Sequence, residues 1–279
     1  MSKIACVLLF LVFLCDGVCA QEHVCGTDRV VVPLRGNGNI NVVILGDSNT
    51  SIGGDACDNP RGWNKWFKDK FAPAACRSYA RSGATWTNTA RTIYDIKEYT
   101  EKLSDNNVIY NQVNRLKADC SGKRQVEPDL ILIAAGTNDA WFDTSRPGVF
   151  SKTASLAFEY DGGFITGRKA SDVRTLAESV RYCCELLMER FPDAQIILLT
   201  PMQSVVAGAA KIRRAGDIIE ECARRMGLCV IRQDRENCVY YVREKMSKKY
   251  TTDGTHTGED GARRNGCYIA NRVSAMLQM

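Results

Sequence analysis

Residues 41–49 of the chain read Asn-Val-Val-Ile-Leu-Gly-Asp-Ser-Asn. The first five form an almost continuously apolar run, which is typical of a strand whose parallel sheet is covered by helices on both faces. The residues that follow, Gly46 to Asn49, are small or polar and would begin the loop at the carboxyl end of that strand. In sheets of this kind the ligand crevice lies outside the carboxyl ends of the strands. We therefore expect the chemistry of this protein to lie near Ser48.

Four further apolar runs rich in β-branched residues follow, and helical patterns separate them. Strands are predicted over residues 76–80, 129–135, 195–200 and 228–232. Helices are predicted over residues 62–71, parts of 87–119, 172–191, 207–226 and 258–277. This alternation predicts one α/β domain, a three-layer α/β/α sandwich around a five-stranded parallel sheet. The long segment between residues 139 and 170 is expected to pass over the substrate edge of that sheet.

A possible serine nucleophile is followed, far along the chain, by a histidine that could serve as its base. A serine hydroxyl becomes a good nucleophile when a histidine, oriented by a carboxylate, removes its proton. The chain has two histidines, and His23 lies near the start of the chain. This leaves His256 for the folded domain, and Asp253, three residues earlier, is close enough to orient its ring. We predict that Ser48, His256 and Asp253 are the catalytic residues.

The oxyanion formed during acyl transfer needs hydrogen-bond donors that are already in position. Candidates at the ends of three successive strands are the backbone N–H groups of Ser48 and Gly83 and the side-chain amide of Asn138. Taken singly, Gly83 and Asn138 are more typical of a turn and a helix cap, but their joint placement favours a function. We interpret Asp47 and Asp139 as carboxylates that order the loops by accepting backbone N–H bonds.

Four blocks carry these residues: Gly46-Asp47-Ser48, Ser82-Gly83, Gly136-Thr137-Asn138-Asp139 and Asp253-Gly254-Thr255-His256. In this order they resemble the four signature blocks of the SGNH, or GDSL-like, hydrolases, and the resemblance spans residues 41–277. It implies a flavodoxin-like sheet, a Ser48–His256–Asp253 triad and an oxyanion hole formed by Ser48, Gly83 and Asn138.

Two departures from the family pattern leave the subfamily open. The second block lacks an upstream Asn-x-Gly, and His256 is followed by Thr257 instead of proline. The α/β-hydrolase fold is a poorer fit, because its nucleophile lies mid-chain in Gly-x-Ser-x-Gly, whereas Thr50 replaces the second glycine here.

All four tryptophans follow a signature block. Trp63 and Trp66 have helical spacing and are expected to pack against the sheet, whereas Trp86 and Trp141 are predicted near the rim of the cleft. Indole faces there could stack on a sugar ring, although anchoring of loops is an equal alternative. We expect a serine esterase acting on O-acyl, in particular O-acetyl, esters of carbohydrate. The alternatives are a lipase or thioesterase, acyl transfer to a sugar, and a glycan-binding module with a vestigial triad.

Residues 1–20 have the pattern of a signal peptide: Lys3, an apolar run over residues 4–15 and a small residue at Ala20. We therefore expect export and a single mature domain over residues 21–279. Lipoprotein anchoring through Cys15 or Cys19 is less favoured, because the residues before them are larger than such processing prefers. No later segment is apolar over the length of a membrane helix, so stable membrane insertion is not expected.

The charge and cysteine content narrow the function classes further. The 37 Lys and Arg against 32 Asp and Glu give a net charge of +5, and the basic residues are scattered, so nucleic-acid binding is not expected. No CxxC pair and only two histidines argue against zinc, and we expect no metal and no cofactor. Of 13 cysteines, ten follow Ala20, an even number that allows disulfides, although Cys76 and Cys229 also suit small buried apolar positions. Disulfide pairing and oligomeric state stay open.

Overall fold

The computed structural model describes residues 37–95, 97, 100–159 and 162–277. All of the described residues belong to one compact unit. The predicted signal peptide over residues 1–20, together with His23 and Cys25, lies outside the described residues.

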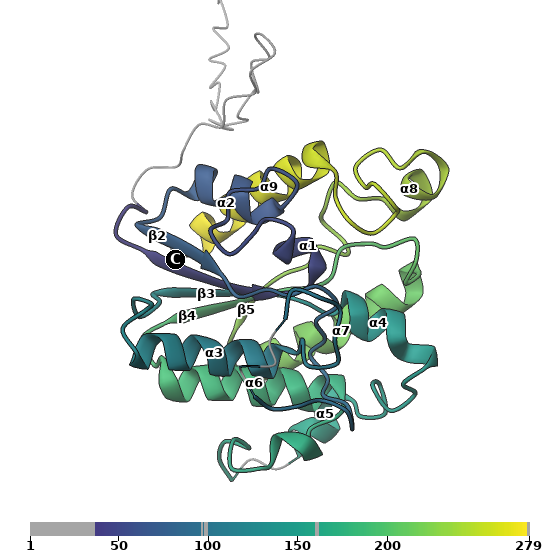
Figure 1. The fold of residues 1–279 in the computed structure, drawn as a ribbon. Coiled ribbons are helices and arrows are strands. Elements are labelled where there is room, and N and C mark those ends of the chain that lie inside the picture. The colour runs from purple at the N-terminus through teal and green to yellow at the C-terminus, as the bar shows by residue number, and fades with distance from the viewer. Residues whose placement is uncertain (1–36, 96, 98–99, 160–161, 278–279) are drawn as a thin grey trace, which may run out of the picture. The chain divides into compact units, whose positions relative to one another are not determined.

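A five-stranded parallel sheet forms the centre of the described residues (Figure 1). Its strands lie in the order β2-β1-β3-β4-β5, so the chain leaves β1 toward one edge and then crosses to the other side. The strands are β1 (Asn41–Gly46), β2 (Ala75–Ser78), β3 (Leu130–Ala134), β4 (Gln195–Leu199) and β5 (Cys229–Ile231). All five predicted strands are confirmed, and the strand order reverses between β1 and β3, the point beside which ligands bind in sheets of this kind.

Helices cover both faces of the sheet (Figure 1). Alternate residues of β1 point to opposite faces, because Val42 and Ile44 belong to one core cluster and Val43 and Leu45 to the other. This explains why the strand is apolar without alternation. One face is covered by α2 (Trp63–Phe71) and α9 (Glu259–Leu277), and the other by α3 (Ile109–Ser121), α6 (Leu176–Arg190) and α7 (Ala209–Arg225). The predicted α/β/α sandwich is confirmed.

The first long helix of the fold and the last one pack closely against each other. In α9, Gly266 has no room for a side chain, since a Cβ there would lie 2.3 Å from the carbonyl oxygen of Trp63. Trp63 and Trp66 of α2 are both buried, as predicted for residues that pack the helix.

Shorter elements connect the sheet to its helices. They are α1 (Ser48–Ser51), α4 (Thr137–Trp141), the 3-10 turn η2 (Phe142–Thr144), α5 (Ala154–Ala157), the 3-10 turn η3 (Ala170–Asp172) and α8 (Tyr241–Ser247). Of these, α1 follows β1 directly and α4 follows β3, so both begin at the carboxyl edge of the sheet. Among the described residues, no helix has the length and apolar character needed to cross a membrane.

Candidate active site

The chain turns sharply from β1 into α1. At Gly46 a Cβ would lie 2.7 Å from both the carbonyl oxygen of Ala134 and Oγ1 of Thr50, so glycine is the residue that fits. Asp47 then caps α1, because its Oδ1 accepts the N–H of Asn49 at 3.1 Å. As a result, Ser48 is the first helical residue, and it is 7% exposed at the carboxyl edge of the sheet.

A buried glutamine of α3 holds this turn from the other side. Oε1 of Gln112 accepts the Gly46 N–H at 2.8 Å, and its Nε2 donates to the Gly46 carbonyl oxygen, also at 2.8 Å. The side chain therefore satisfies both backbone groups of the residue where β1 ends, two positions before Ser48. Gln112 was not among the residues predicted from the sequence, since a glutamine within a helix has no motif of its own.

The structure brings Ser48, His256 and Asp253 together. His256 Nε2 lies 2.8 Å from Ser48 Oγ, and His256 Nδ1 lies 2.7 Å from Asp253 Oδ2. Oδ1 of Asp253 accepts the backbone N–H groups of Thr255 and His256 at 2.9 and 2.8 Å. Partial burial raises the pKa of Asp253, but the hydrogen bonds from His256 and Thr255 outweigh it and hold that pKa below its usual value.

The loop that carries His256 is fixed at both of its ends. Thr251 and Thr257 form an antiparallel bridge, and the Thr252 N–H donates to the His256 carbonyl oxygen at 2.8 Å. The buried carboxylate of Glu244 in α8 accepts the N–H and Oγ1–H of Thr251. Glu244 is a second positioning residue that the sequence did not reveal.

A direct hydrogen bond joins this loop to α1, the serine helix that begins at Ser48, because the Thr257 N–H donates to Asn49 Oδ1 at 3.4 Å.

The second and third signature blocks meet beside this turn. Gly83 has φ of +72°, in the left-handed region that favours glycine. Asn138, in the first turn of α4, donates from Nδ2 to the carbonyl oxygen of Ala84 at 2.9 Å. An amide nitrogen carries two hydrogens, and this bond uses one of them. The Arg81 N–H donates to the Gly46 carbonyl oxygen at 3.2 Å, which connects the second block to the first.

The two aspartates of the blocks order the loops, in agreement with the interpretation from the sequence. Asp139 is fully buried and accepts the N–H groups of Trp86 and Thr87 at 3.0 and 3.1 Å and the Thr87 hydroxyl at 2.8 Å. Asp47 accepts a hydrogen bond from the side chain of Thr137 as well as from Asn49. Burial raises the pKa of both carboxyls, that of Asp47 to about 6.

The family model of the GDSL-like lipase/acylhydrolases matches residues 44–264 of the chain. The chain belongs to this family. The matched residues contain all four blocks, from β1 into α9. Membership in the GDSL-like family makes the protein an ester-hydrolysing enzyme, in line with the resemblance seen in its sequence. A search of curated proteins gives no match.

Solved structures share the GDSL-type fold at low sequence identity. A protein from Bacteroides uniformis described as a GDSL-like lipase is 19% identical, with a TM-score of 0.54, over 85% of this chain and 97% of that one. The acetyl xylan esterase AlAXEase is 16% identical, with a TM-score of 0.51, over 85% and 99%. A protein from Lactobacillus plantarum is 14% identical, with a TM-score of 0.57, over 86% and 97%. At such identities the likeness shows the fold alone.

One predicted substrate contact of this GDSL-type enzyme is wrong. Trp86 was expected near the rim of the cleft, but it is 0% exposed and belongs to the core between the sheet, α3 and α6. Asp139 holds its backbone N–H, and the ring turns inward from there. A sugar therefore has no access to its face. Trp141, the last residue of α4, is 43% exposed and stays a candidate.

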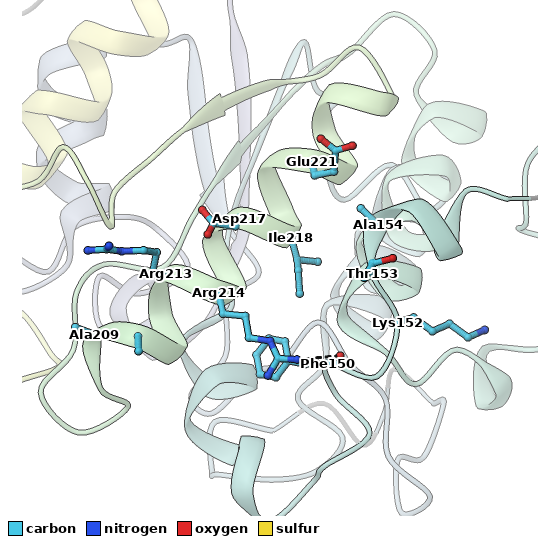
Figure 2. Close-up of a pocket in the computed structure, with 11 residues that line it drawn as sticks. Phe150, Lys152, Thr153, Ala154, Ala209, Arg213, Arg214, Asp217, Ile218 and Glu221 are labelled. Atoms are coloured by element: carbon cyan, nitrogen blue, oxygen red, sulfur yellow. Dashed lines mark hydrogen bonds between the residues drawn. The ribbon is translucent and has the colours of Figure 1, made fainter.

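One hollow of the described residues lies apart from the serine. It has a volume of about 700 Å³ and lies between α7 and the segment around Phe150 (Figure 2). Arg214 of α7 stacks over the Phe150 ring there and donates to its carbonyl oxygen at 3.2 Å. None of the signature residues lines it. Within the described part of the chain, no group of three or more His, Cys, Asp or Glu side chains could hold a metal ion.

Proposed function

We propose that this protein is an exported serine esterase that removes O-acyl groups, in particular O-acetyl groups, from carbohydrate. The observation that carries the proposal is the continuous hydrogen-bonded series from Ser48 Oγ through His256 to Asp253, with distances of 2.8 and 2.7 Å. A serine, an imidazole and a carboxylate in this order are the groups that acyl transfer needs.

In the acylation step, Ser48 Oγ attacks the carbonyl carbon of the ester while His256 Nε2 takes the hydroxyl proton. Asp253 Oδ2 accepts a hydrogen bond from His256 Nδ1–H, which stays on the ring, and the carboxylate stabilises the imidazolium that forms. The Ser48 N–H, the Gly83 N–H and Asn138 Nδ2 donate to the oxyanion. His256 then protonates the sugar oxygen, and the sugar leaves with a free hydroxyl.

In the deacylation step, His256 removes a proton from water, and the resulting hydroxide attacks the acyl group on Ser48. The tetrahedral intermediate collapses, Ser48 Oγ regains its proton from His256, and the carboxylic acid leaves. A sugar hydroxyl in place of water would give acyl transfer by the same intermediate.

The carbohydrate part of the proposal rests on Trp141. Its ring is exposed at the end of α4, the short helix whose first turn carries Asn138. An exposed indole supplies an apolar face for the C–H groups of a sugar. The likeness in fold to an acetyl xylan esterase is consistent with such a substrate.

Export and the domain boundary are part of the same proposal. Residues 1–20 would direct the chain out of the cytoplasm and be removed, which leaves one hydrolase domain over residues 21–279. Polymeric carbohydrate outside the cell would be within reach of such an enzyme. Sequencing of the N-terminus of the mature protein tests the boundary, and a chain that keeps residues 1–20 would contradict it.

Covalent labelling tests the nucleophile. A fluorophosphonate probe should label the wild-type protein at Ser48 and leave the Ser48→Ala variant unlabelled. Ser51→Ala is a matched control, because Ser51 lies in the same helix and its hydroxyl donates to the Ser48 carbonyl oxygen at 3.3 Å. A wild-type protein that fails to react would support a glycan-binding module with a vestigial triad and would contradict the proposal.

A substrate panel tests the specificity. We expect acetate release from acetylated xylan, pectin or sialosides to exceed the hydrolysis of long-chain acyl esters and thioesters. A preference for long acyl chains would indicate a lipase or thioesterase instead. Product analysis with and without an added sugar acceptor separates hydrolysis from acyl transfer.

A further inference from the structure

Two cysteines from different parts of the chain meet next to the serine helix. Cys57 lies in the turn that links α1 to α2, and Cys76 lies in the edge strand β2. Their sulfur atoms are 3.7 Å apart, and both are thiols in this structure. A disulfide would require the two sulfurs to approach to about 2.05 Å.

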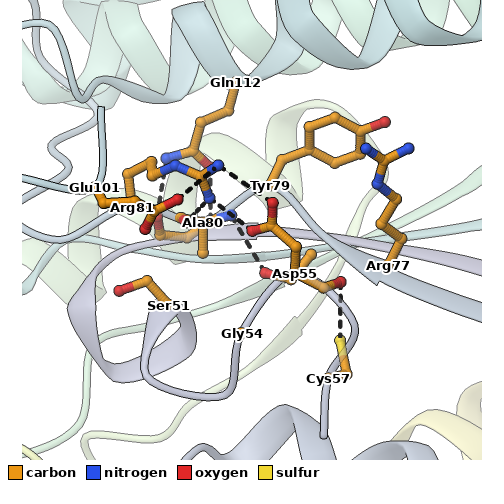
Figure 3. Close-up of polar contacts among 12 residues, drawn as sticks. Ser51, Gly54, Asp55, Cys57, Arg77, Tyr79, Ala80, Arg81, Glu101 and Gln112 are labelled. Carbon is orange, nitrogen blue, oxygen red and sulfur yellow. Dashed lines mark hydrogen bonds and ion pairs between the residues drawn. The ribbon is translucent and has the colours of Figure 1, made fainter. Parts of the chain in front are cut away.

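Other contacts already hold the Cys57 turn against β2. The Ser78 N–H donates to the Asp55 carbonyl oxygen at 2.9 Å. The buried guanidinium of Arg81 binds the Asp55 carboxylate through Nη1 and Nη2 at 2.7 and 3.2 Å (Figure 3). These contacts connect residues two positions away from Cys57 to residues just beyond Cys76. The approach of the two thiols is therefore built into the fold.

The local environment of Cys57 also favours a fixed position. Its backbone has φ of +53°, which is uncommon for a residue with a side chain and persists when the surroundings determine it. Asn64 of α2, which is fully buried, donates to its sulfur at 3.4 Å. Cys57 is itself buried at 1% exposed. The hydrogen bond between the two sulfurs lowers the pKa of the Cys57 thiol and raises that of the Cys76 thiol, so Cys57 is the better first nucleophile of the pair.

We propose that Cys57 and Cys76 form a disulfide that ties the segment after the serine helix to the edge of the sheet. The oxidant would be the disulfide of a thiol–disulfide oxidoreductase or of a small thiol such as glutathione. One cysteine thiolate attacks that disulfide, forms a mixed disulfide and releases the first thiol of the oxidant. The second thiolate attacks the mixed disulfide and releases the second thiol of the oxidant, so two cysteines lose two electrons and two protons and the oxidant gains them.

The bond would close a loop of 19 residues that contains all of α2. Closing such a loop stabilises the folded state mainly by restricting the unfolded chain. The inference rests on the proposed export, because disulfides persist in oxidising compartments. It does not depend on the esterase activity, since labelling of Ser48 reports on that separately.

The test uses purified full-length protein equilibrated with oxidised and reduced glutathione, so it does not require export to be correct. After equilibration, the protein is unfolded in iodoacetamide and digested without reductant. We expect one cross-linked peptide pair that joins Cys57 to Cys76 and is two hydrogen atoms lighter than the separate peptides. Alkylation of both thiols, or a bond from either to another cysteine, would overturn the proposal.

Thermal unfolding gives a second readout. The oxidised wild-type protein should unfold about 5–10 °C above the Cys57→Ser, Cys76→Ser double variant. The single variant Cys76→Ser should match the double variant. Cys238→Ser is the matched control, since Cys238 is partly buried and its sulfur contacts the Gly261 carbonyl oxygen instead of a cysteine. Equal melting temperatures for wild type and double variant under oxidising conditions would also overturn the proposal.

Discussion

Asp253 and His256 differ in their access to solvent. The side chain of Asp253 is 52% exposed, whereas that of His256 is 26% exposed. Water can therefore partly replace a missing Asp253 carboxylate, but nothing replaces the imidazole beside Ser48. We expect Ser48→Ala and His256→Ala to lower kcat by about 10⁴-fold or more. The loss of kcat in Asp253→Ala should be smaller than these by a factor of about 10 to 100. Steady-state kinetics on a small acetyl ester measure the difference, and equal losses for Asp253 and His256 would contradict it.

Asp47 predicts a pH dependence of stability. Burial raises its pKa from 3.8 to about 6, so between these two pH values the carboxyl is mostly protonated in the folded state and mostly ionised in the unfolded state. The contribution of this group to the free energy of unfolding is therefore full below about pH 4, falls by up to about 3 kcal/mol between about pH 4 and 6, and does not change further above that pH. Urea unfolding of wild type and Asp47→Asn across this range should show a steeper decline for wild type.

The control for that experiment is Asp58→Asn, at an exposed position in the turn before α2. Its stability should follow the wild-type pH profile. A wild-type profile that runs parallel to that of Asp47→Asn would show that the Asp47 carboxyl titrates alike in both states.

The exposed ring of Trp141 leads us to expect that its substitution changes the kinetics on a polymeric substrate but not on a small one. If its exposed ring contacts a sugar, Trp141→Ala should raise KM on acetylated xylan about 5 to 10-fold and leave kinetics on a small acetyl ester unchanged. Trp141→Phe, which keeps an aromatic face, should restore part of the affinity. Equal kinetics of all three proteins on the polymer would remove the main support for a carbohydrate substrate.

Among the elements, α3 controls the end of β1 through a single side chain. Gln112→Leu removes both hydrogen bonds to Gly46. The Gly46 carbonyl oxygen keeps the hydrogen bond from the Arg81 N–H, but the buried Gly46 N–H is left unsatisfied, which costs about 1–3 kcal/mol of folding free energy. Because Ser48 lies two residues further on, kcat should fall while KM changes little. Fluorophosphonate labelling rates measure the reactivity of Ser48, and urea unfolding measures the loss of folding free energy.

Gln112→Glu provides the matched comparison, since it keeps an acceptor for the Gly46 N–H and loses the donor. Its labelling rate should lie between those of wild type and Gln112→Leu. If both variants label at the wild-type rate while stability falls, Gln112 stabilises the fold without positioning the serine.

The strands and long helices were predictable because burial against the sheet imposes an apolar pattern that is visible within each segment of the sequence. The polar side chains that position the catalytic residues were not predictable. Gln112 and Glu244 act on backbone groups 66 and seven residues away, and no local pattern specifies such partners. The error at Trp86 has a similar cause: its spacing of three residues from Gly83 reveals neither the direction of the turn nor the contact with Asp139. The blocks themselves were recognisable because each follows a strand.

Across the whole domain, the contact between α2 and α9 joins the first long helix to the last. Gly266→Ala would place a Cβ 2.3 Å from the Trp63 carbonyl oxygen and 2.7 Å from the Trp66 Cβ, so backbone must move. We expect a loss of about 1–3 kcal/mol in urea unfolding. Gly148→Ala is the control, because a Cβ there meets nothing within 4 Å. Equal stability of the two variants would mean that α2 and α9 move apart to admit the methyl group without a loss of folding free energy.

The hydrogen bond between Ser48 and His256 joins residues 208 positions apart. During synthesis the base emerges 208 residues after the serine, and α9, which follows His256 within a few residues, must then pack against α2. A nascent or truncated chain can thus hold the serine turn without any means of deprotonating it. The enzyme would acquire reactivity only after Asp253 and His256 have been synthesised and the loop that carries them has folded against Ser48.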